Sequence, residues 1–459
     1  MDRTLEKRIT RLNDVASADG RCVVYWMQSS LRSEDNPALN AAIHEANTRN
    51  QPLLVFFSID RSIPSANQRN FTFILECLKE TIPRFKSMGA SVCMRFGDSV
   101  ANVIDVSLDS EASLIVTDES HLNEGRKRRD GASKQVKVPM YQVDSNVVVP
   151  VREIPKEQYA AYTIRPRLHK LMPAYLKGGE RYTLKNRREI EVYGDVSDVD
   201  VKKALKRLDL PYVPASTLFH GGESQAEYTL WRFIEDRLEG YAENRNHPEL
   251  SGTSDMSPYL RFGNISPITM LMKVMESGGP QEDIDSFIEE AFVRRELAEN
   301  FTFYDRNYRS FESLPGWAME TIDKHRRDER SHVFTLHELE NASTGEDLWD
   351  ASQYEMLKTG KMSNYMRMVW GKRVIEWTRT PEDALNILLF MNDKYEIDGR
   401  SPNGYTCIMW CFGKHDRAFG ERPVLGKLRY MSPSGIKKKF STYTYIQSTG
   451  LKEKAELRM

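Results

Sequence analysis

The sequence predicts an N-terminal α/β domain built on a doubly wound, mostly parallel sheet, then a long linker and an all-α C-terminal domain. Short β-rich runs alternate with helical segments in the first 150 residues, which is typical of parallel sheets. Beyond residue 220, apolar residues recur with the period of a helix. With 459 residues, the chain is also longer than one ordinary domain. We therefore predict domains at 1–150 and 221–459, with the linker at 151–220.

Apolar runs in the first segment are the expected strands. Five runs are rich in β-branched or aromatic residues: 21–27, 52–60, 90–96, 113–120 and 138–144. Between them, the periodicity predicts helices at 36–50 and 67–89. The run GRKRRD at 125–130 is expected to be a solvated turn. No G-x-G-x-x-G follows the first strand, so the usual dinucleotide fingerprint is missing.

The middle of the chain is less regular. Residues 144–218 contain repeated prolines and predict a connector that runs over the surface. After it, five segments have the helical period: 226–246, 266–276, 283–301, 345–360 and 364–378. The second half is therefore predicted to be a helical domain.

Composition favours a reduced, intracellular environment. Apolar residues make up 40% and charged residues 29%, and no run approaches the roughly 18 apolar residues of a membrane span. The N-terminal run MDRTLEKRITRLN lacks the apolar core of a secretory signal. The five cysteines and nine histidines show neither a disulfide framework nor metal-ligand spacing. We expect a monomer of the cytoplasm, nucleoid or nucleus, not secreted, with no membrane contact and no bound metal.

A net charge of -1 means that any nucleic-acid contact must come from a local patch. Residues 401–459 contain 11 Lys and Arg against 4 Asp and Glu, a surplus of seven. Such a surplus can neutralise several phosphates, and it can equally be a solvated, weakly basic end of a domain.

Tryptophans stand out in the segment 360–377. Trp370 and Trp377 are seven residues apart, so they lie on one helix face, about 10.5 Å apart along the axis. Trp349 begins the preceding helical segment, and a short turn at 359–360 would fold that segment back against the next. Three indoles can thus form a chain. Core packing is the usual reason for such spacing, and a relay for single electrons is the other; both can hold.

Two polar clusters suit a phosphate-bearing heterocycle. The run 251–263 places small and hydroxyl residues before a helix: Gly252, Thr253, Ser254, Asp255 and Ser257. Such groups bind phosphate, and they also serve as plain helix caps. The run 391–405 contains Asn392, Asp398 and Asn403, which can bond a ring edge or form turns.

Many stretches together resemble the photolyase/cryptochrome family of flavoproteins, and most closely its class II branch, which repairs cyclobutane pyrimidine dimers. They are CVVYWMQSSLRSEDNPAL, YAAYTIRPRLHKLMPAYL, YAENRNHPELSG, MSPYLRFGNIS, EEAFVRRELAENFTFY, DLWDASQYEML, MRMVWGKRVIEWT, NDKYEIDGRSPNGY and ERPVLGKLRYMSPSGIKKKF. The resemblance covers nearly the whole chain, in order, which makes it far more specific than any single motif.

The resemblance implies a Rossmann-like antenna domain and a C-terminal FAD-binding domain that holds FAD in a U shape. Tyr241 and the run 254–257 would hold the phosphates and ribityl chain. Arg367 and Asp398 would pair beside the isoalloxazine, and Asn392 would face its N5. The full set implied to bind FAD is Tyr241, Thr253, Ser254, Asp255, Met256, Ser257, Asn364, Arg367, Met368, Asn392, Asp398, Gly399 and Asn403. An antenna chromophore, of the deazaflavin type or another, is also implied.

The implied reaction is light-driven: excited, reduced flavin gives an electron to the flipped-out dimer, the cyclobutane ring splits and the electron returns. Glu290 matches the carboxylate that hydrogen-bonds the lesion. Trp349, Trp370 and Trp377 match the relay that reduces the flavin. The residues implied to contact UV-damaged DNA or the lesion are Arg245, Asn246, Met368, Trp410, Arg417, Phe419 and Arg429. Without the resemblance, we would interpret these residues as part of the core or of the solvated surface.

The chain departs from the branch at the implied flavin and DNA sites. Ser363 and Asn364 stand where the branch has His-Gly, Val369 where Tyr is common, and Phe419 where a Trp enters the DNA bubble. The loop FGKHD before Phe419 is one residue short. Phe can still wedge a base step.

Three other functions are compatible with the same pattern. A cryptochrome-like blue-light receptor would bind FAD without repair, but only about twenty residues follow IKKKF, which favours repair. Repair of (6-4) photoproducts uses histidines, and the segment 360–380 has none. A protein that has lost its flavin is the last alternative.

Overall fold

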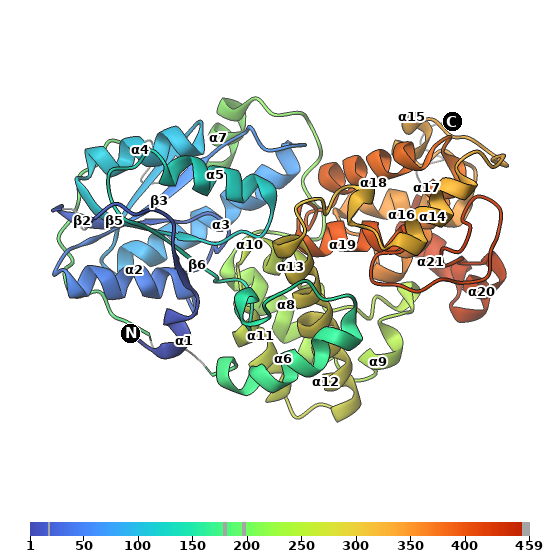
Figure 1. Ribbon diagram of the computed structural model, residues 1–459, viewed down its shortest axis with the longest axis horizontal. Coiled ribbons are helices and arrows are strands. Elements are labelled where there is room, and N and C mark those ends of the chain that lie inside the picture. Colours follow the sequence, from blue (N-terminus) through green and yellow to red (C-terminus); the bar gives the residue numbers. More distant parts are fainter. Residues whose placement is uncertain (17–18, 178–180, 195–198, 452–459) are drawn as a thin grey trace.

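The computed structural model describes residues 1–16, 19–177, 181–194 and 199–451. Figure 1 shows a sheet flanked by helices at one end of the molecule and a larger group of helices at the other. Among the described residues, no helix is long and apolar enough to cross a membrane. The predicted combination of an α/β region with an all-α region is confirmed.

One six-stranded sheet forms the N-terminal half, in the order β1-β6-β5-β2-β3-β4. The strands are β1 (Ile9–Arg11), β2 (Cys22–Trp26), β3 (Leu53–Ile59), β4 (Ser91–Phe96), β5 (Ala112–Asp118) and β6 (Met140–Val143). All five predicted strands are present and pair in parallel. The short edge strand β1, which pairs with β6 antiparallel, was not predicted. Residues of β2 and β5 are buried throughout, because helices cover both faces of the sheet.

Five helices belong to this half: α1 (Arg3–Glu6), α2 (Pro37–Thr48), α3 (Gln68–Ser87), α4 (Ser99–Asp109) and α5 (Asn123–Ser133). The two predicted helices begin where the side chains of Asn36 and Asn67 accept bonds from free backbone amides. The expected solvated turn at 125–130 is wrong, because this run lies within α5. Arg129 is buried there, where its guanidinium donates to Gln142 Oε1 and to the Ser120 carbonyl oxygen.

The connector at 144–218 contains more regular structure than expected: η1 (Val151–Glu153), α6 (Ala161–Tyr175) and α7 (Val201–Leu208). The sequence pattern missed α6 because Pro166 and Pro173 lie inside it. Part of the connector, at 178–180 and 195–198, lies outside the described residues. The domain boundaries themselves stay predictions.

The helical half contains every helix predicted after residue 220, and further short ones. In order they are α8 (Glu223–Asp236), α9 (Tyr241–Asn244), η2 (Pro248–Leu250), α10 (Ser257–Phe262), α11 (Pro267–Met275), α12 (Gln281–Ile288), η3 (Glu289–Arg294), α13 (Arg295–Tyr304), η4 (Phe311–Ser313), α14 (Gly316–His325), α15 (Leu336–Glu340), α16 (Asp347–Thr359), α17 (Asn364–Trp377), α18 (Pro381–Tyr395), α19 (Pro402–Cys411), α20 (Pro433–Lys439) and α21 (Thr442–Thr449). The stretch η3 is a π-helix between α12 and α13. Such turns are frequent at functional sites.

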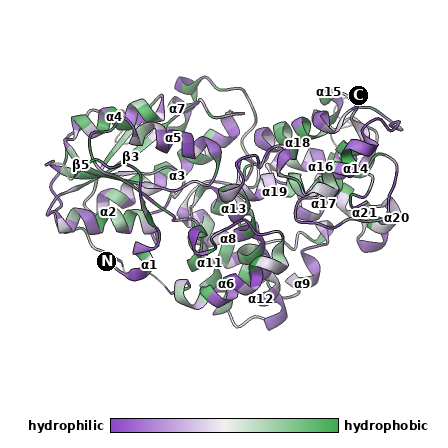
Figure 2. Cartoon of the chain, viewed as in Figure 1, coloured by the Kyte–Doolittle hydropathy of each residue, from purple (hydrophilic) through white to green (hydrophobic). Residues whose placement is uncertain are grey.

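The hydrophobic cores do not follow the halves. One core cluster joins one side of the sheet to α8–α13, and another fills the space among α14–α21. A third lies on the other side of the sheet. The strands in Figure 2 are coloured as strongly hydrophobic, whereas many helices alternate between hydrophobic and hydrophilic residues. The first helices of the C-terminal half therefore share one hydrophobic core with this side of the sheet.

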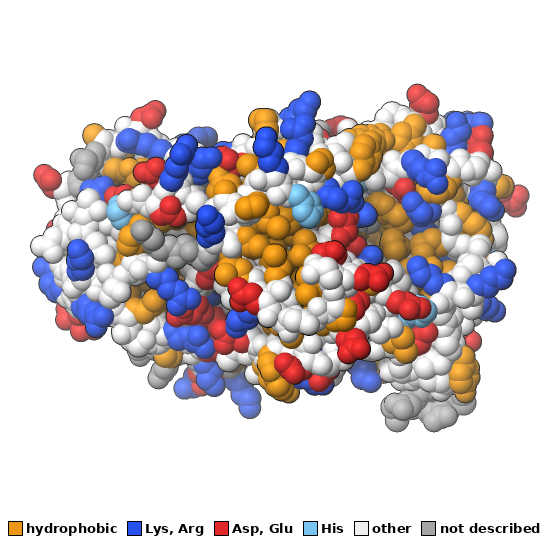
Figure 3. All heavy atoms as spheres, turned by 90° about the horizontal axis from the view of Figure 1, so that it is seen from below, with side chains coloured by type: hydrophobic (Ala, Val, Ile, Leu, Met, Phe, Trp, Pro, Cys, Tyr) orange, Lys and Arg blue, Asp and Glu red, His pale blue; other side chains and the backbone are white. Residues whose placement is uncertain are grey.

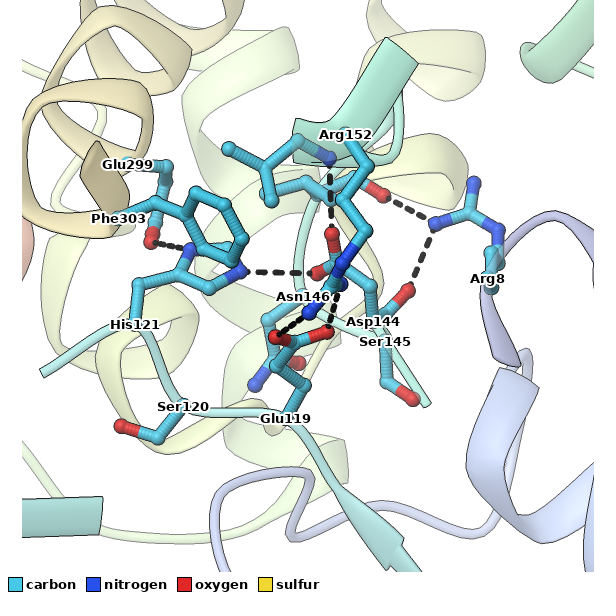
Figure 4. Close-up of polar contacts among 12 residues, drawn as sticks. Arg8, Glu119, Ser120, His121, Asp144, Ser145, Asn146, Arg152, Glu299 and Phe303 are labelled. Carbon is cyan, nitrogen blue, oxygen red and sulfur yellow. Dashed lines mark hydrogen bonds and ion pairs between the residues drawn. The ribbon is translucent and has the colours of Figure 1, made fainter. Parts of the chain in front are cut away.

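A buried ionic cluster joins the sheet to α13. Figure 4 shows His121, just after β5, between Glu299 of α13 and Asp144, just after β6. Its Nδ1 lies 2.7 Å from Glu299 Oε2 and its Nε2 lies 3.3 Å from Asp144 Oδ1. Burial alone would lower the pKa of His121, but the two carboxylates raise it to about 10. The imidazolium is therefore a positive bridge between two negative groups from different halves.

Glu119, His121 and Asp144 also place ligand atoms within 4.8 Å of one another, as a metal site would. Their partners favour an ionic network instead. Both oxygens of Glu119 accept bonds from Arg152, at 2.6 and 2.8 Å (Figure 4). A protonated imidazole has no lone pair for a metal, and the guanidinium would repel one.

Replacing His121 by Gln should destabilise the protein in a pH-dependent way. The folded pKa of about 10 lies above the unfolded value of about 6.5, so the protonated bridge stabilises fully below about pH 6.5 and is lost as pH rises through 10. H121Q should thus lower the free energy of unfolding by about 3 kcal/mol at about pH 6 and by much less near pH 10. The exposed control H332Q should change stability by less than about 0.5 kcal/mol. A destabilisation by H121Q that does not vary with pH would contradict the charged bridge.

Candidate functional site

A cavity of about 360 Å³ lies where the two halves meet. Its wall combines residues at the carboxyl ends of β2 and β5, the loop after β6, and side chains from α10, η3, α13, α17 and α19. Ligands of open parallel sheets bind at this edge of the sheet. In the space-filling view of one long face, hydrophobic side chains gather in the middle and Lys and Arg side chains lie around them (Figure 3).

We name this cavity the large cavity because more residues line it than line the adjoining ones. Most residues that the sequence predicts at the site are in its wall. They are Tyr241, Arg245, Thr253, Ser254, Asp255, Met256, Ser257, Glu290, Asn364, Arg367, Met368, Asp398, Asn403 and Trp410. They come from segments up to 169 residues apart in the chain (241 to 410), which the fold brings together. Their roles stay predictions.

The run 253–257 forms a polar end of the large cavity. Asp255 binds two cations, Lys361 and Arg237, and its contact with Arg237 Nη1 measures 2.6 Å. Burial would raise the pKa of Asp255, but these cations hold it below its usual value. Lys361 Nζ also donates to Thr253 Oγ1 at 2.8 Å. One carboxylate thus fixes two cations next to a row of hydroxyl groups.

Arg367 forms a second buried ionic contact in the wall. Its Nη2 lies 2.9 Å from Asp398 Oδ1 and 2.9 Å from Glu396 Oε2, and all three side chains are largely buried. Burial raises the pKa of Glu396 to about 8, and the nearby charge of Asp398 adds to this against the pull of Arg367. At neutral pH, the Glu396 carboxyl group is therefore largely protonated. The predicted Arg367–Asp398 pair is present.

Two of the predicted cofactor residues do not line the large cavity. Asn392 lines a small adjoining cavity of about 20 Å³, which also contacts Trp370, Arg367 and Met368. Its Nδ2 donates to Asp393 Oδ1 at 2.9 Å. Gly399 lies behind the wall, where its carbonyl oxygen accepts a bond from Arg261 Nε at 3.2 Å.

The three tryptophans stand in contact, with Trp349 in the middle. The Trp349 and Trp370 rings are stacked, with centroids 6.5 Å apart, and the Trp349 and Trp377 centroids are 5.7 Å apart. All three are buried. Trp370 Nε1 donates to Gln353 Oε1 at 2.9 Å. The turn between α16 and α17 thus produces the predicted chain of indoles, which begins beside the small cavity.

Glu290 lies within the π-helical stretch η3 and pairs with Arg245, whose Nη1 is 3.0 Å from Glu290 Oε1. The sequence predicted separate roles for the two, at the lesion and at the DNA. Both side chains are about a quarter exposed, so the pair sits at the open side of the large cavity.

The remaining predicted DNA contacts cluster around a second cavity of about 730 Å³ that adjoins the first. Its wall includes Asn246, Phe419 and Arg429, and it shares Trp410 and Met368 with the large cavity. Arg417 lies outside this wall, with its guanidinium 5.0 Å from the Phe419 ring centroid. The residues predicted to contact DNA thus lie next to those predicted to bind the cofactor.

Several wall residues were not predicted, notably Lys361, His121 and His415. Lys361 follows Gly360 in the segment singled out for its tryptophans, so its place beside them was a usable signal. The sequence around His121 and His415 contains no signal for a site, because tertiary contacts alone bring these histidines to the cavity. Burial lowers the pKa of His415 to about 4, so its imidazole is neutral at neutral pH.

Comparisons with known proteins agree on one family. A DNA photolyase family model matches residues 23–184. The deoxyribodipyrimidine photo-lyase of Methanothermobacter thermautotrophicus is 39% identical over 96% of this chain and 97% of its own. The chain belongs to the DNA photolyase family, whose activity is light-dependent repair of UV-damaged DNA with FAD as cofactor.

Solved structures share the fold. A class III photolyase of Agrobacterium tumefaciens is 18% identical, with a TM-score of 0.69 over 95% of this chain and 88% of that one. A cryptochrome of Synechocystis sp. is 15% identical, with a TM-score of 0.72 over 94% of this chain and 88% of that one. Since repair proteins and cryptochromes share the fold, the fold alone does not separate the two functions.

The donor set of the large cavity fits FAD. Arg245 Nε and Arg295 Nη1 are buried donors with no hydrogen-bond partner among the described residues, and both side chains line the wall. These unpaired donors suit polar groups of a bound ligand, and Lys361 with the hydroxyls of Thr253 and Ser254 suits a phosphate at the polar end of the cavity. The Arg367–Asp398 pair offers a donor and an acceptor side by side, which suits the polar edge of a flavin ring.

Removing the charge of Asp398 should impair flavin binding. In D398N the Arg367 cation loses its charged partner, and we expect the affinity for FAD to fall by about ten-fold because a buried charge is left uncompensated. The matched variant E396Q removes a carboxyl group that is largely protonated, so its affinity for FAD should fall much less. Titration of the flavin-free variants with FAD measures both. Equal losses in D398N and E396Q would contradict the assigned charges.

Proposed function

We propose that this protein is a deoxyribodipyrimidine photo-lyase that repairs cyclobutane pyrimidine dimers by light-driven electron transfer. The observation that carries the proposal is that three groups of residues are neighbours: the three tryptophans, the Arg367–Asp398 pair, and Glu290 with Trp410. The indole chain ends beside the Arg367–Asp398 pair, and this pair lines the same cavity as Glu290 and Trp410. Electron supply, flavin and lesion would thus be adjacent.

When bound, FAD would supply a light-absorbing ring able to give one electron to the dimer and take it back. Arg367, held by Asp398, would orient the ring edge, and Asn392 would tune the ring from the small cavity. Lys361 and the hydroxyls of Thr253 and Ser254 would hold the phosphates. An antenna chromophore, if bound, would belong to the α/β half.

Trp370, Trp349 and Trp377 carry electrons from the surface to the flavin. Consecutive rings lie 6.5 and 5.7 Å apart, close enough for transfer between neighbours. The side-chain oxygen Oε1 of Gln353 accepts a hydrogen bond from Trp370 Nε1. This bond stabilises the positive charge left on the indole when it gives up an electron.

On the DNA side, the protein flips the dimer into the large cavity, which costs a few kcal/mol and least for a poorly stacked lesion. Trp410 stacks on the flipped bases, worth about 1–3 kcal/mol per base. Glu290, oriented by Arg245, accepts a hydrogen bond from the lesion. Phe419, Arg417, Arg429 and Asn246 contact the DNA around the gap.

Features of the cavities argue against the alternatives. A receptor without repair does not need a second cavity walled by aromatic and cationic side chains. Repair of (6-4) photoproducts uses active-site histidines. Of the two histidines named in the wall of the large cavity, His121 is held between Glu299 and Asp144, and His415 is neutral because burial lowers its pKa to about 4. We also propose that the protein acts inside the cell as a monomer.

Blue light should enable the FAD-loaded, reduced protein to restore a thymine-dimer oligonucleotide, with no repair in the dark. A (6-4) oligonucleotide should remain unrepaired. In E290Q the rate of repair should fall by about ten-fold or more, because a charge-assisted bond to the lesion is lost. Chromatography of the oligonucleotide strands measures restoration. Flavin-loaded protein that binds the dimer without restoring it would overturn the proposed activity and favour the receptor function.

A further inference from the structure

Lys372 is a cation in an unusual place. It lies on α17, two residues after Trp370, and only 2% of its surface is exposed. Its Nζ donates to the Cys411 carbonyl oxygen at 2.5 Å, and no carboxylate of the described residues forms an ion pair with it. Burial lowers the pKa of Lys372 to about 8. An unpaired buried charge is destabilising, so its presence calls for a functional reason.

The ammonium sits over Trp410. Its Nζ lies 5.4 Å from the Trp410 ring centroid, and the guanidinium of Arg429 lies 5.3 Å from the same centroid. Arg429 is neutralised by Asp416, with two contacts of 2.9 Å. The charge at Trp410 that lacks a counter-ion in contact is therefore that of Lys372.

Trp370 and Trp377 have different surroundings. The Nε1 of Trp370 donates to the neutral side chain of Gln353. The cation over Trp377, Arg373, is paired with Glu376 at 2.8 Å. A positive charge over an indole opposes removal of an electron from it, whereas an acceptor on its N–H favours removal. The relay is thus easier to oxidise than Trp410.

The difference matters because Trp410 also lines the large cavity and is available to the flavin as an electron donor. Trp410 has no ring neighbour at contact distance in the described part of the chain, whereas Trp370 is followed by Trp349 and Trp377. With no neighbouring ring to carry the positive charge away, the Trp410 radical would stay beside the reduced flavin, and return of the electron to Trp410 would be fast. Oxidation of Trp410 would be unproductive.

We propose that Lys372 is a positioning residue that holds a positive charge over Trp410. This charge makes Trp410 hard to oxidise and so directs oxidation into the Trp370–Trp349–Trp377 relay. The inference rests on the relay function proposed above. In the step concerned, the Trp370 indole gives one electron to light-excited oxidised flavin and becomes a radical cation. Trp349 then donates an electron to the Trp370 radical cation, and Trp377 donates one to Trp349. A thiol reductant in solution finally returns one electron to Trp377.

The test compares light-driven flavin reduction, without DNA, in FAD-loaded wild type, K372M and K372M/W410F. Dithiothreitol is the reductant, and the pH is about 6.5, at which Lys372 is charged. K372M should reduce flavin about ten-fold more slowly because the charge over Trp410 is lost. The double variant should recover most of the rate, because the competing donor is removed. A merely structural role of Lys372 would not give this recovery.

Transient absorption should also detect a short-lived tryptophan radical in K372M that is absent from K372M/W410F. A wild-type rate in K372M, or a double variant as slow as K372M, would overturn the role of Lys372. The variant W349F lacks the middle indole and gives the rate of flavin reduction without a working relay. If W349F reduces flavin as fast as wild type, the relay itself is wrong and the inference is overturned with it. Flavin content and thermal unfolding verify folding; if K372M does not fold, K372Q replaces it with the same expectation.

Discussion

The buried ion pair of Arg367 with Asp398 is the interaction on which the site depends. It joins α17 to the turn between α18 and α19, so it sets the distance between the helix that carries the tryptophans and the helix that carries Trp410. A guanidinium in this position is tolerated only because a charged carboxylate and a carboxyl group share it. Loss of the pair would leave the wall of the large cavity without a fixed geometry.

Helix α17 makes three kinds of contact because its faces differ. Asn364, Arg367 and Met368 line the large cavity, Trp370 and Trp377 pack against Trp349 of α16, and Lys372 reaches under α19. The helical period places these groups at fixed angles to one another, so a shift in one contact moves the others. The basic residues among the tryptophans thus have two different roles: Arg367 binds within the wall and Lys372 shapes the charge around Trp410.

Patterns in the sequence predicted the architecture because buried strands and amphipathic helices are local signals. The strand β1 escaped notice, since three half-exposed residues carry little pattern. The helix α5 was missed because its charged run looks solvated, whereas Arg129 is buried through bonds formed only in the fold. The same reason hid His121 and His415. Family resemblance supplied most of the residues around the cavities, but not the Arg245–Glu290 pair or the position of Asn392 in a separate small cavity.

A crystal structure of the FAD-loaded protein with a duplex containing a thymine dimer would test the account most directly. The flavin ring should lie against the Arg367–Asp398 pair and next to Trp370, with the dimer flipped out between Glu290 and Trp410. Phe419 should occupy the gap in the duplex. A dimer that remains stacked in the duplex, or a flavin bound away from Arg367, would contradict the arrangement of electron supply, cofactor and lesion in adjoining cavities.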